Sequence, residues 1–380
     1  MKLFQCQNCG QPLYFENTRC EHCGLSLGYL PDRETITALE PERGPRNTQR
    51  NIWRALADAK TYRYCANAAY EVCNWLISEA RADAYCAACR HNKMIPDLSF
   101  PENLHKWRAL ELAKHRLFYT LVQLRLPVET QAESPAGLAF EFLADIAPSG
   151  SSIMTGHADG VITINLAEAD DSERERRRHQ MGEPYRTPLG HFRHEIAHYY
   201  WDRLIADTPH LEDFRRMFGD ERRDYGSALQ DYYANGAPPD WSDHFISAYA
   251  SSHPWEDFAE TWAHYFHMID TVETAHFAGL AVSPKLPQSP GAVFDFHPRD
   301  TSMQRLVDAW LALTFAVNSI NRSMGLHDLY PFVLGPLAVA KLTFVQERIV
   351  AVAPRRAEIR TGQGTSVRRR VLGRLWSETT

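Results

Sequence analysis

The pattern His-Glu-Ile-Ala-His, which begins at His194 and ends at His198, places two imidazoles four residues apart with Glu195 between them. On an α-helix this spacing puts both histidines on one face, so both can bind the same Zn²⁺ ion. Glu195 could then accept a proton from the water molecule that zinc activates. Thr187-Pro188 provides an N-cap and a proline at the first helical position, so we expect a helix over about 188–205. The sequence therefore predicts a catalytic zinc site on this helix.

A catalytic zinc ion needs a third protein ligand, and a second predicted helix offers one. This helix begins after His253-Pro254, has acids in its first turn, and carries an aromatic stripe formed by Trp255, Phe258, Trp262 and Phe266. A different face carries ionisable side chains, namely Glu256, Glu260, His264 and His267. Carboxylates that point into a metal site would explain why ionisable side chains gather on this face. We interpret its two histidines as packing or surface residues. Weaker candidates are Asp202, which would crowd the same helix, and Asp224, which lacks a fuller motif.

All eight cysteines lie between Cys6 and Cys89, and the remaining 291 residues contain none. The first four form two CxxC pairs separated by ten residues: Cys6, Cys9, Cys20 and Cys23. Two such pairs at this spacing are typical of a zinc ribbon, in which four thiolates hold one structural zinc ion. A chance pair of motifs or a redox pair is the alternative.

The second set of cysteines is less regular and consists of Cys65, Cys73, Cys86 and Cys89. The segment Tyr64–Ile77 has helical periodicity, so we expect Cys65 and Cys73 on one helix face, facing the Cys86/Cys89 pair. Together they would form a second structural Cys₄ zinc site. Two buried cysteines plus a solitary CxxC pair is the competing interpretation. His22 and His91 could replace a thiolate, but neither is needed.

Composition excludes several classes of protein. The net charge is −6 with a pI near 6.3, so the whole chain is not an electrostatic nucleic-acid binder, and the neutral head at residues 1–30 has no basic stripe. The longest apolar stretches, 309–317 and 332–340, are far shorter than the roughly 20 residues that cross a bilayer. Because no secretory leader is evident, we expect a reducing, cytoplasmic location, where metal thiolates are favoured over disulfides.

The domain organisation that we expect is a zinc ribbon at 1–30, a linker and helical segment with the second Cys₄ site at 31–100, a metallopeptidase domain at 101–347, and a basic tail at 348–380. Within it we expect a linker at 31–50, a strand at Val161–Leu166, and helices at Asn51–Ser78, Glu102–Leu124, Thr301–Asn318 and Pro331–Glu347. The fold class is α+β and mainly helical. The tail, with seven arginines against two glutamates from Ile349, is a solvated end or docks an acidic partner or nucleic acid.

Beyond these motifs, the HExxH pattern followed by a helix with ExxxE resembles the gluzincin metallopeptidases. The segment from Tyr249 to Glu260 is similar to the lethal-factor and Pro-Pro endopeptidase branch, and the whole chain resembles an uncharacterised bacterial family of zinc-binding metallopeptidases with an N-terminal zinc ribbon. The resemblance implies a zincin-like body in which Glu256 is the third zinc ligand and Glu260 orients a ligand histidine. It also implies that Tyr249 stabilises the oxyanion.

These observations lead to the hypothesis of a zinc endopeptidase in which Glu195 is the general base, with one catalytic and two structural zinc ions. Its partners would be a protein or peptide substrate, which could pair with the strand Val161–Leu166, and a protein recognised by the zinc ribbon. No membrane or nucleic-acid partner is expected. The alternatives are a catalytically inactive zinc-binding scaffold or interaction protein and a SprT-like DNA-associated protease.

Overall fold

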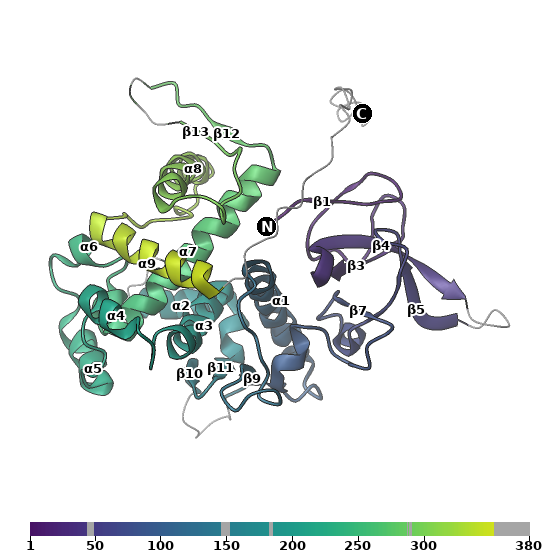
Figure 1. Ribbon diagram of the computed structural model, residues 1–380, viewed down its shortest axis with the longest axis horizontal. Coiled ribbons are helices and arrows are strands. Elements are labelled where there is room, and N and C mark those ends of the chain that lie inside the picture. The colour runs from purple at the N-terminus through teal and green to yellow at the C-terminus, as the bar shows by residue number, and fades with distance from the viewer. Residues whose placement is uncertain (44–48, 146–152, 182–184, 287, 289–290, 353–380) are drawn as a thin grey trace.

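The N-terminal part of the chain, residues 1–100, is built from short strands rather than from helices (Figure 1). The computed structural model describes residues 1–43, 49–145, 153–181, 185–286, 288 and 291–352. Its head begins with the hairpin β1 (Phe4–Gln5) and β2 (Pro12–Leu13). An antiparallel sheet of consecutive neighbours follows, made of β3 (Ser26–Leu30), β4 (Thr35–Arg43), β5 (Gln49–Ala55), β6 (Thr61–Tyr64) and β7 (Leu76–Ser78).

The expected linker at 31–50 and helix at Asn51–Ser78 are therefore wrong. Strand β4 occupies nine of the residues in the linker range and buries Ile36, Ala38 and Leu39 in the head. Strands β5, β6 and β7 occupy the helical range, with a 3₁₀ turn at Ala66–Tyr70. Aromatic and β-branched residues in this stretch favour strands once neighbouring strands cover them, and this tertiary packing outweighs the local helical periodicity.

A second sheet has the order β10-β11-β9-β8 and lies under the helices of the body. Its strands are β8 (Asn92–Met94), β9 (Ala139–Leu143), β10 (Gly156–Ala158) and β11 (Val161–Asn165). The strand expected near Val161 is confirmed, but it pairs with β10 on one side and β9 on the other. An added peptide strand therefore cannot pair with β11 as expected. Among the described residues, the edges of this sheet are β10 and β8.

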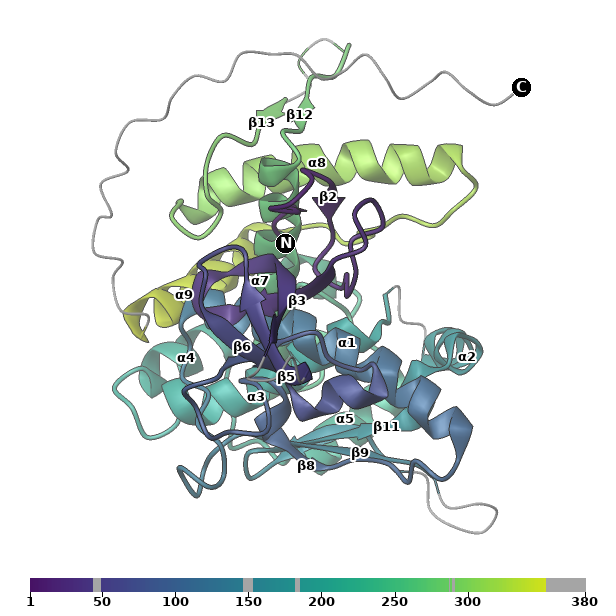
Figure 2. The same ribbon diagram turned by 90° about the vertical axis from the view of Figure 1, so that its right-hand side faces the viewer.

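Helices make up most of the body (Figures 1 and 2). They are α1 (Pro101–Leu124), α2 (Asp171–Met181), α3 (Pro188–Leu204), α4 (Leu211–Phe218), α5 (Tyr225–Asn235), α6 (Trp241–His244), α7 (Pro254–Phe277), α8 (Met303–Ser323) and α9 (Pro336–Val352). A mainly helical α+β fold is thus confirmed for the described residues. The hairpin of β12 (Ala281–Val282) and β13 (Ala292–Val293) packs beside α8.

Helix α1 lies between the head and the rest of the body (Figure 1). Phe15 of the head has its ring 5.3 Å from the ring of Tyr119 on α1, and the Lys2 backbone amide donates to the Tyr119 hydroxyl. That hydroxyl in turn donates to Glu273 on α7 at 2.7 Å. Buried residues of head and body form one continuous hydrophobic core. The head is consequently packed onto the body through α1.

No helix in the described part of the chain is long and apolar enough to cross a membrane. The basic tail expected at 348–380 lies outside the described residues from residue 353 onward.

The core around α1 gives a direct test of the fold. Phe118 is fully buried on α1, with its ring 5.9 Å from Phe140 of β9. We expect Phe118→Ala to lower the free energy of unfolding by about 3–5 kcal/mol, because it removes buried apolar surface and leaves a cavity. The control Phe315→Ala, on the exposed side of α8, should change it by about 0.5 kcal/mol or less. Equal shifts of the two variants in urea unfolding would contradict this placement.

Candidate metal centre and active site

The HExxH residues lie on α3, which begins where the sequence predicts. Thr187 is the N-cap, and its hydroxyl accepts a hydrogen bond from the Gly190 amide at 3.0 Å. The first helical residue is Pro188, whose missing amide hydrogen costs nothing at this position. The apolar face of α3 is buried and includes Phe192, Ile196, Tyr199 and Tyr200. This burial fixes the rotation of α3 and directs His194 and His198 toward α7.

Helix α7 begins with equally specific capping. The His253 ring accepts a hydrogen bond from the Trp255 amide through Nδ1, and Pro254 follows as the first helical residue. Trp262 on this helix stacks on Tyr200 of α3, with ring centroids 5.1 Å apart and an interplanar angle of 17°. Trp262 of the predicted aromatic stripe thus contacts α3, whereas Phe258 of the same stripe packs on α4. Glu256, on a neighbouring face of α7, reaches the two histidines of α3.

Three side chains converge with the separations that zinc requires. His194 Nε2 lies 2.9 Å from Glu256 Oε2, and His198 Nε2 lies 3.6 Å from Glu256 Oε1. The two Nε2 atoms are 3.3 Å apart. Tetrahedral ligands at about 2.0–2.1 Å from zinc are about 3.3 Å from one another, so one ion fits this set. Glu256 is buried, and its two carboxylate oxygens face the His194 and His198 rings rather than solvent, as expected of a carboxylate that shares a metal ion with them.

The candidate ligands are held by further polar contacts. Glu260 Oε1 lies 2.9 Å from His194 Nδ1, which leaves the Nε2 atom of that ring directed to the metal position. The Ser247 hydroxyl donates to Glu260 Oε2 at 2.7 Å, and the Tyr225 hydroxyl donates to Glu256 Oε1 at 2.8 Å. Sequence reasoning found Glu260 but missed Ser247 and Tyr225. Neither belongs to a motif, and the chain brings them to the site only through the fold of the segment between α3 and α7.

Glu195 is buried beside the candidate ligands and lines a cavity of about 220 Å³. Burial raises the pKa of Glu195 to about 7, with a further increase from the nearby Glu256 carboxylate and a decrease from His194. A carboxylate with a pKa near neutrality is well matched to proton transfer. Tyr249 lines the same cavity, with its ring 6.0 Å from the His194 ring and packed edge-on against Tyr232.

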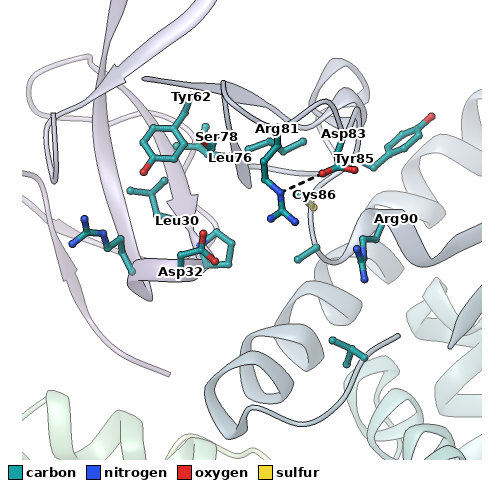
Figure 3. A pocket seen from close by; sticks show the side chains of 15 residues that line it. Leu30, Asp32, Tyr62, Leu76, Ser78, Arg81, Asp83, Tyr85, Cys86 and Arg90 are labelled. Carbon is teal, nitrogen blue, oxygen red and sulfur yellow. Dashed lines mark ion pairs between the residues drawn. The ribbon is translucent and has the colours of Figure 1, made fainter. Parts of the chain in front are cut away.

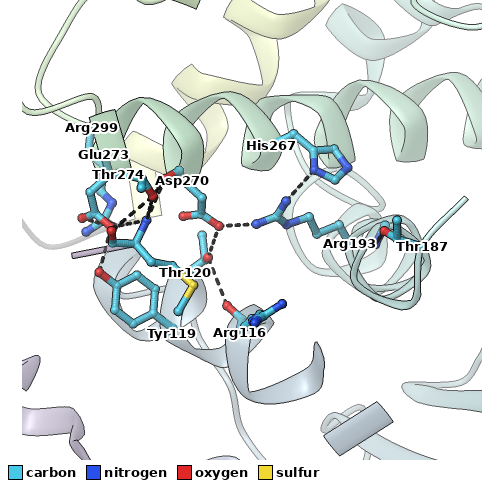
Figure 4. A network of polar contacts seen from close by, with 12 residues as sticks. Arg116, Tyr119, Thr120, Thr187, Arg193, His267, Asp270, Glu273, Thr274 and Arg299 are labelled. Carbon is cyan, nitrogen blue, oxygen red and sulfur yellow. Dashed lines mark hydrogen bonds and ion pairs between the residues drawn. The ribbon is translucent and has the colours of Figure 1, made fainter. Parts of the chain in front are cut away.

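A buried polar network next to His194 joins helices α1, α3 and α7 (Figure 4). Arg193, next to His194 on α3, pairs with Asp270 of α7 and lies 2.5 Å from Nδ1 of His267. The Thr120 hydroxyl of α1 donates to the same Asp270 carboxylate at 2.6 Å. This network ties α1, α3 and α7 together at the level of the HExxH motif.

The other candidate ligands lie elsewhere. Asp224 is the N-cap of α5 and accepts from the Ser227 amide, and neither it nor Asp202 belongs to a described metal-ligating group. His264 is buried, as a packing histidine should be, but both it and His267 also line the cavity. The interpretation of these two histidines as packing or surface residues was therefore incomplete.

Both cysteine sets converge in the head. In the first set Cys6 Sγ and Cys23 Sγ are 3.7 Å apart, and Cys9 Sγ and Cys20 Sγ are 3.6 Å apart. These distances fit four thiolates around zinc, which are about 3.8 Å from one another at Zn–S distances of about 2.3 Å.

In the second set Cys73 Sγ and Cys86 Sγ are 3.7 Å apart, and all four cysteines are buried. Cys65 and Cys73 flank a 3₁₀ turn instead of sharing a helix, so their expected grouping holds although the expected helix does not. His91 contacts the Leu138 carbonyl instead of a metal position. His115 of α1 lies 3.6 Å from Cys89 Sγ and was not foreseen.

The head has a cavity of similar volume, about 220 Å³, between its sheet and the Cys86 loop (Figure 3). Most of its charged side chains pair with one another or with neighbours, as Arg81 does with Asp83 and Arg33 with Asp58. Of the cysteines only Cys86 lines it, and none of the HExxH residues do. The two cavities have the same volume, but only the body cavity is lined by residues of the HExxH motif. The body cavity is therefore the candidate active site.

Two families of known proteins match parts of this chain. A family described as "putative zinc-binding metallo-peptidase" matches residues 103–348, and a "zinc-ribbon domain" matches residues 3–100. This chain belongs to that zinc-binding metallopeptidase family. Uncharacterized proteins of Mycobacterium bovis and Mycobacterium tuberculosis are 40% identical over 357 residues, which is 93% of this chain and 97% of each relative. No solved structure matches this member of the metallopeptidase family.

The ligand groups predict the metal content. We expect about three zinc atoms per chain by elemental analysis, one for each converging set. His194→Ala should lower the content to about two, because two side chains rarely retain zinc alone. The control His105→Ala, on an exposed position of α1, should retain three. A wild-type content of one or none would contradict the assignment.

Proposed function

We propose that this protein is a zinc-dependent endopeptidase of the gluzincin type, with His194, His198 and Glu256 as the zinc ligands and Glu195 as the general base. The observation that carries the proposal is the convergence of these ligands beside a cavity that is lined by His194 and by the buried Glu195 carboxylate. Three protein ligands leave one coordination position open, which distinguishes a catalytic zinc site from the closed Cys₄ sites of the head.

A bound zinc ion would supply Lewis acidity, lowering the pKa of water and polarising the scissile carbonyl. In the proposed reaction Glu195 removes a proton from the attacking water through a carboxylate oxygen and then delivers it to the leaving amine. Glu260 holds the His194 ring through Nδ1, and the Ser247 hydroxyl holds Glu260 in turn. Burial of Glu195 and Glu256 keeps bulk water from competing for these protons.

Tyr249 is the proposed oxyanion donor. It precedes Glu256 by seven residues, as in the lethal-factor and Pro-Pro endopeptidase branch, and its ring is tilted by 44° against that of His194, with centroids 6.0 Å apart. Burial and the nearby Glu256 carboxylate raise its pKa well above the usual value for tyrosine. The Tyr249 hydroxyl therefore stays protonated at neutral pH and can donate a hydrogen bond to charge that develops on the scissile oxygen.

An extended substrate would pair with β10 rather than with β11. Strand β10 is an edge of the body sheet and packs against α3. Its His157 ring stacks on the His198 ring at 6.5 Å, so the strand runs past the proposed metal position. Backbone hydrogen bonds along such an edge orient a peptide without regard to its sequence.

Glu195→Gln tests the function directly. We expect cleavage of casein and of quenched fluorescent peptides to fall by at least about 10²–10⁴-fold, because the amide cannot accept the proton. Zinc content should stay near three atoms per chain, since Glu195 is not among the ligands. The control Glu212→Gln, on an exposed position of α4, should leave cleavage unchanged. A zinc-loaded wild-type protein that cleaves nothing would instead be a zinc-binding scaffold.

Tyr249→Phe isolates the oxyanion step. Removing one donor should lower kcat by about 10²–10³-fold with little change in KM, because the hydrogen bond forms only in the transition state. Tyr14→Phe, at an exposed position of the head, serves as the control in the same peptide assay. An unchanged kcat in Tyr249→Phe would remove this residue from the mechanism.

A further inference from the structure

A second, smaller compartment lies next to the active-site cavity, and none of its lining residues belongs to α3. The two cavities share Tyr185, His267 and Phe332 as lining residues, so they are neighbours, and we call the two together the trough. The second compartment has a volume of about 60 Å³ and is completed by Thr271, Trp310, Leu329 and Tyr330. The trough runs along the face of α7 that carries Glu260, His264 and His267.

The outer wall of this compartment comes from the segment between α8 and α9, and it is firmly attached. The Tyr330 backbone is bound at both its amide and its carbonyl by the Asn318 side chain. The Tyr330 hydroxyl and His264 Nδ1 share a hydrogen bond of 2.5 Å. Rings pack around these contacts: Tyr330 lies 4.8 Å from Trp310, and Phe332 lies 4.5 Å from His264. The compartment is therefore a preformed feature of the fold.

The chemistry of the trough disfavours charged groups. Among its described lining residues, Arg186 and His191 face the Glu168 carboxylate, at 2.9 Å and 3.1 Å, and Glu260 is bound by His194 and Ser247. Burial lowers the pKa of His264 to about 4, and burial together with Arg193 lowers that of His267, so both rings are neutral at physiological pH. A charged side chain entering the second compartment would lose its hydration without gaining an opposite charge.

We propose that this compartment is a specificity pocket that receives the end of an apolar or aromatic side chain of the peptide substrate, since its volume of about 60 Å³ is less than the roughly 150 Å³ that hold a whole benzene ring. The inference rests on the proposed peptidase function and adds the class of substrate. It draws on the position of the compartment next to the cavity at Glu195, on its aromatic and aliphatic lining, and on the internal pairing of the neighbouring charges. Burying an apolar side chain here contributes favourable free energy in proportion to the area removed from water.

Leu329 offers the sharpest variant because it lines the compartment and is 43% exposed, so a change there should not unfold the protein. We would compare wild type with Leu329→Glu on quenched peptides that carry Phe, Leu, Ala, Glu or Lys at each position flanking the cleaved bond. At one position the wild type should prefer Phe or Leu over Ala by about 10-fold or more in kcat/KM. Leu329→Glu should abolish that preference at that position.

Leu326→Glu is the matched control, because Leu326 lies in the same segment, is 61% exposed and does not line the trough. It should retain the wild-type preference. Wild-type cleavage with no apolar preference at any position, or an equal loss of preference in both variants, would overturn the specificity pocket while leaving the peptidase function intact.

A peptide-binding assay distinguishes failure of the specificity pocket from failure of the proposed peptidase function. In the Glu195→Gln background, a fluorescein-labelled peptide with Phe at the preferred position should bind about 10-fold more tightly than its Ala counterpart. If the wild type cleaves nothing, the Phe and Ala peptides of the same library are compared pairwise at every position. A preference for Phe that is lost in Leu329→Glu and kept in Leu326→Glu supports the pocket even then. Equal binding of all Phe and Ala pairs would overturn it.

Discussion

The packing of α3 against α7 is the constraint on which the site depends. His194 and His198 come from one helix and Glu256 from the other, and their donor atoms lie about 3 Å apart. A shift of one helix by a fraction of that distance would spoil the geometry for a single ion. The stack of Tyr200 on Trp262 and the buried pair between Arg193 and Asp270 hold the two helices together on either side of the ligands. Rigid elements, rather than loops, thus position the candidate ligands.

Helix α1 extends this constraint to the head. One side of α1 presents His115 to Cys89 in the second cysteine cluster. Elsewhere on the same helix, Thr120 and Tyr119 donate to Asp270 and Glu273 of α7. The thiolate cluster and the HExxH region are therefore connected through one helix and its hydrogen bonds. The zinc-binding head acts as a structural part of the body rather than as an independent module on a flexible tether.

The body buries many charges, and several of the described ones near the site are matched by partners from other elements. Asp257, directly after Glu256, pairs with Lys341 of α9, while Glu168 pairs with Arg186. Breaking one such buried pair would leave an uncompensated charge, which is far more costly than the loss of an exposed pair. This internal matching keeps the trough beside the site neutral. An apolar trough next to a charged metal position is the combination that favours peptides with a bulky uncharged side chain.

The local chemistry of the site follows from the sequence alone. The spacing of four in the HExxH motif, together with the caps at Thr187 and His253, determines that His194 and His198 share one face of α3 and that Glu256 lies in the first turn of α7. The grouping of the cysteines by their spacing likewise anticipates both clusters, because ligand spacing is a local property. The helix predicted from periodicity between Asn51 and Ser78 is wrong, because pairing between strands determines the structure there.

Only the tertiary structure decided which residues complete the site. Tyr225, Ser247 and Asp270 belong to no motif, and each reaches the ligands or their helices through contacts between elements far apart in the sequence. The same is true of the wall around Tyr330 and of the edge strand β10. Motifs record spacing along the chain, whereas hydrogen-bond partners and cavity walls depend on how helices pack, and packing is a property of the whole core.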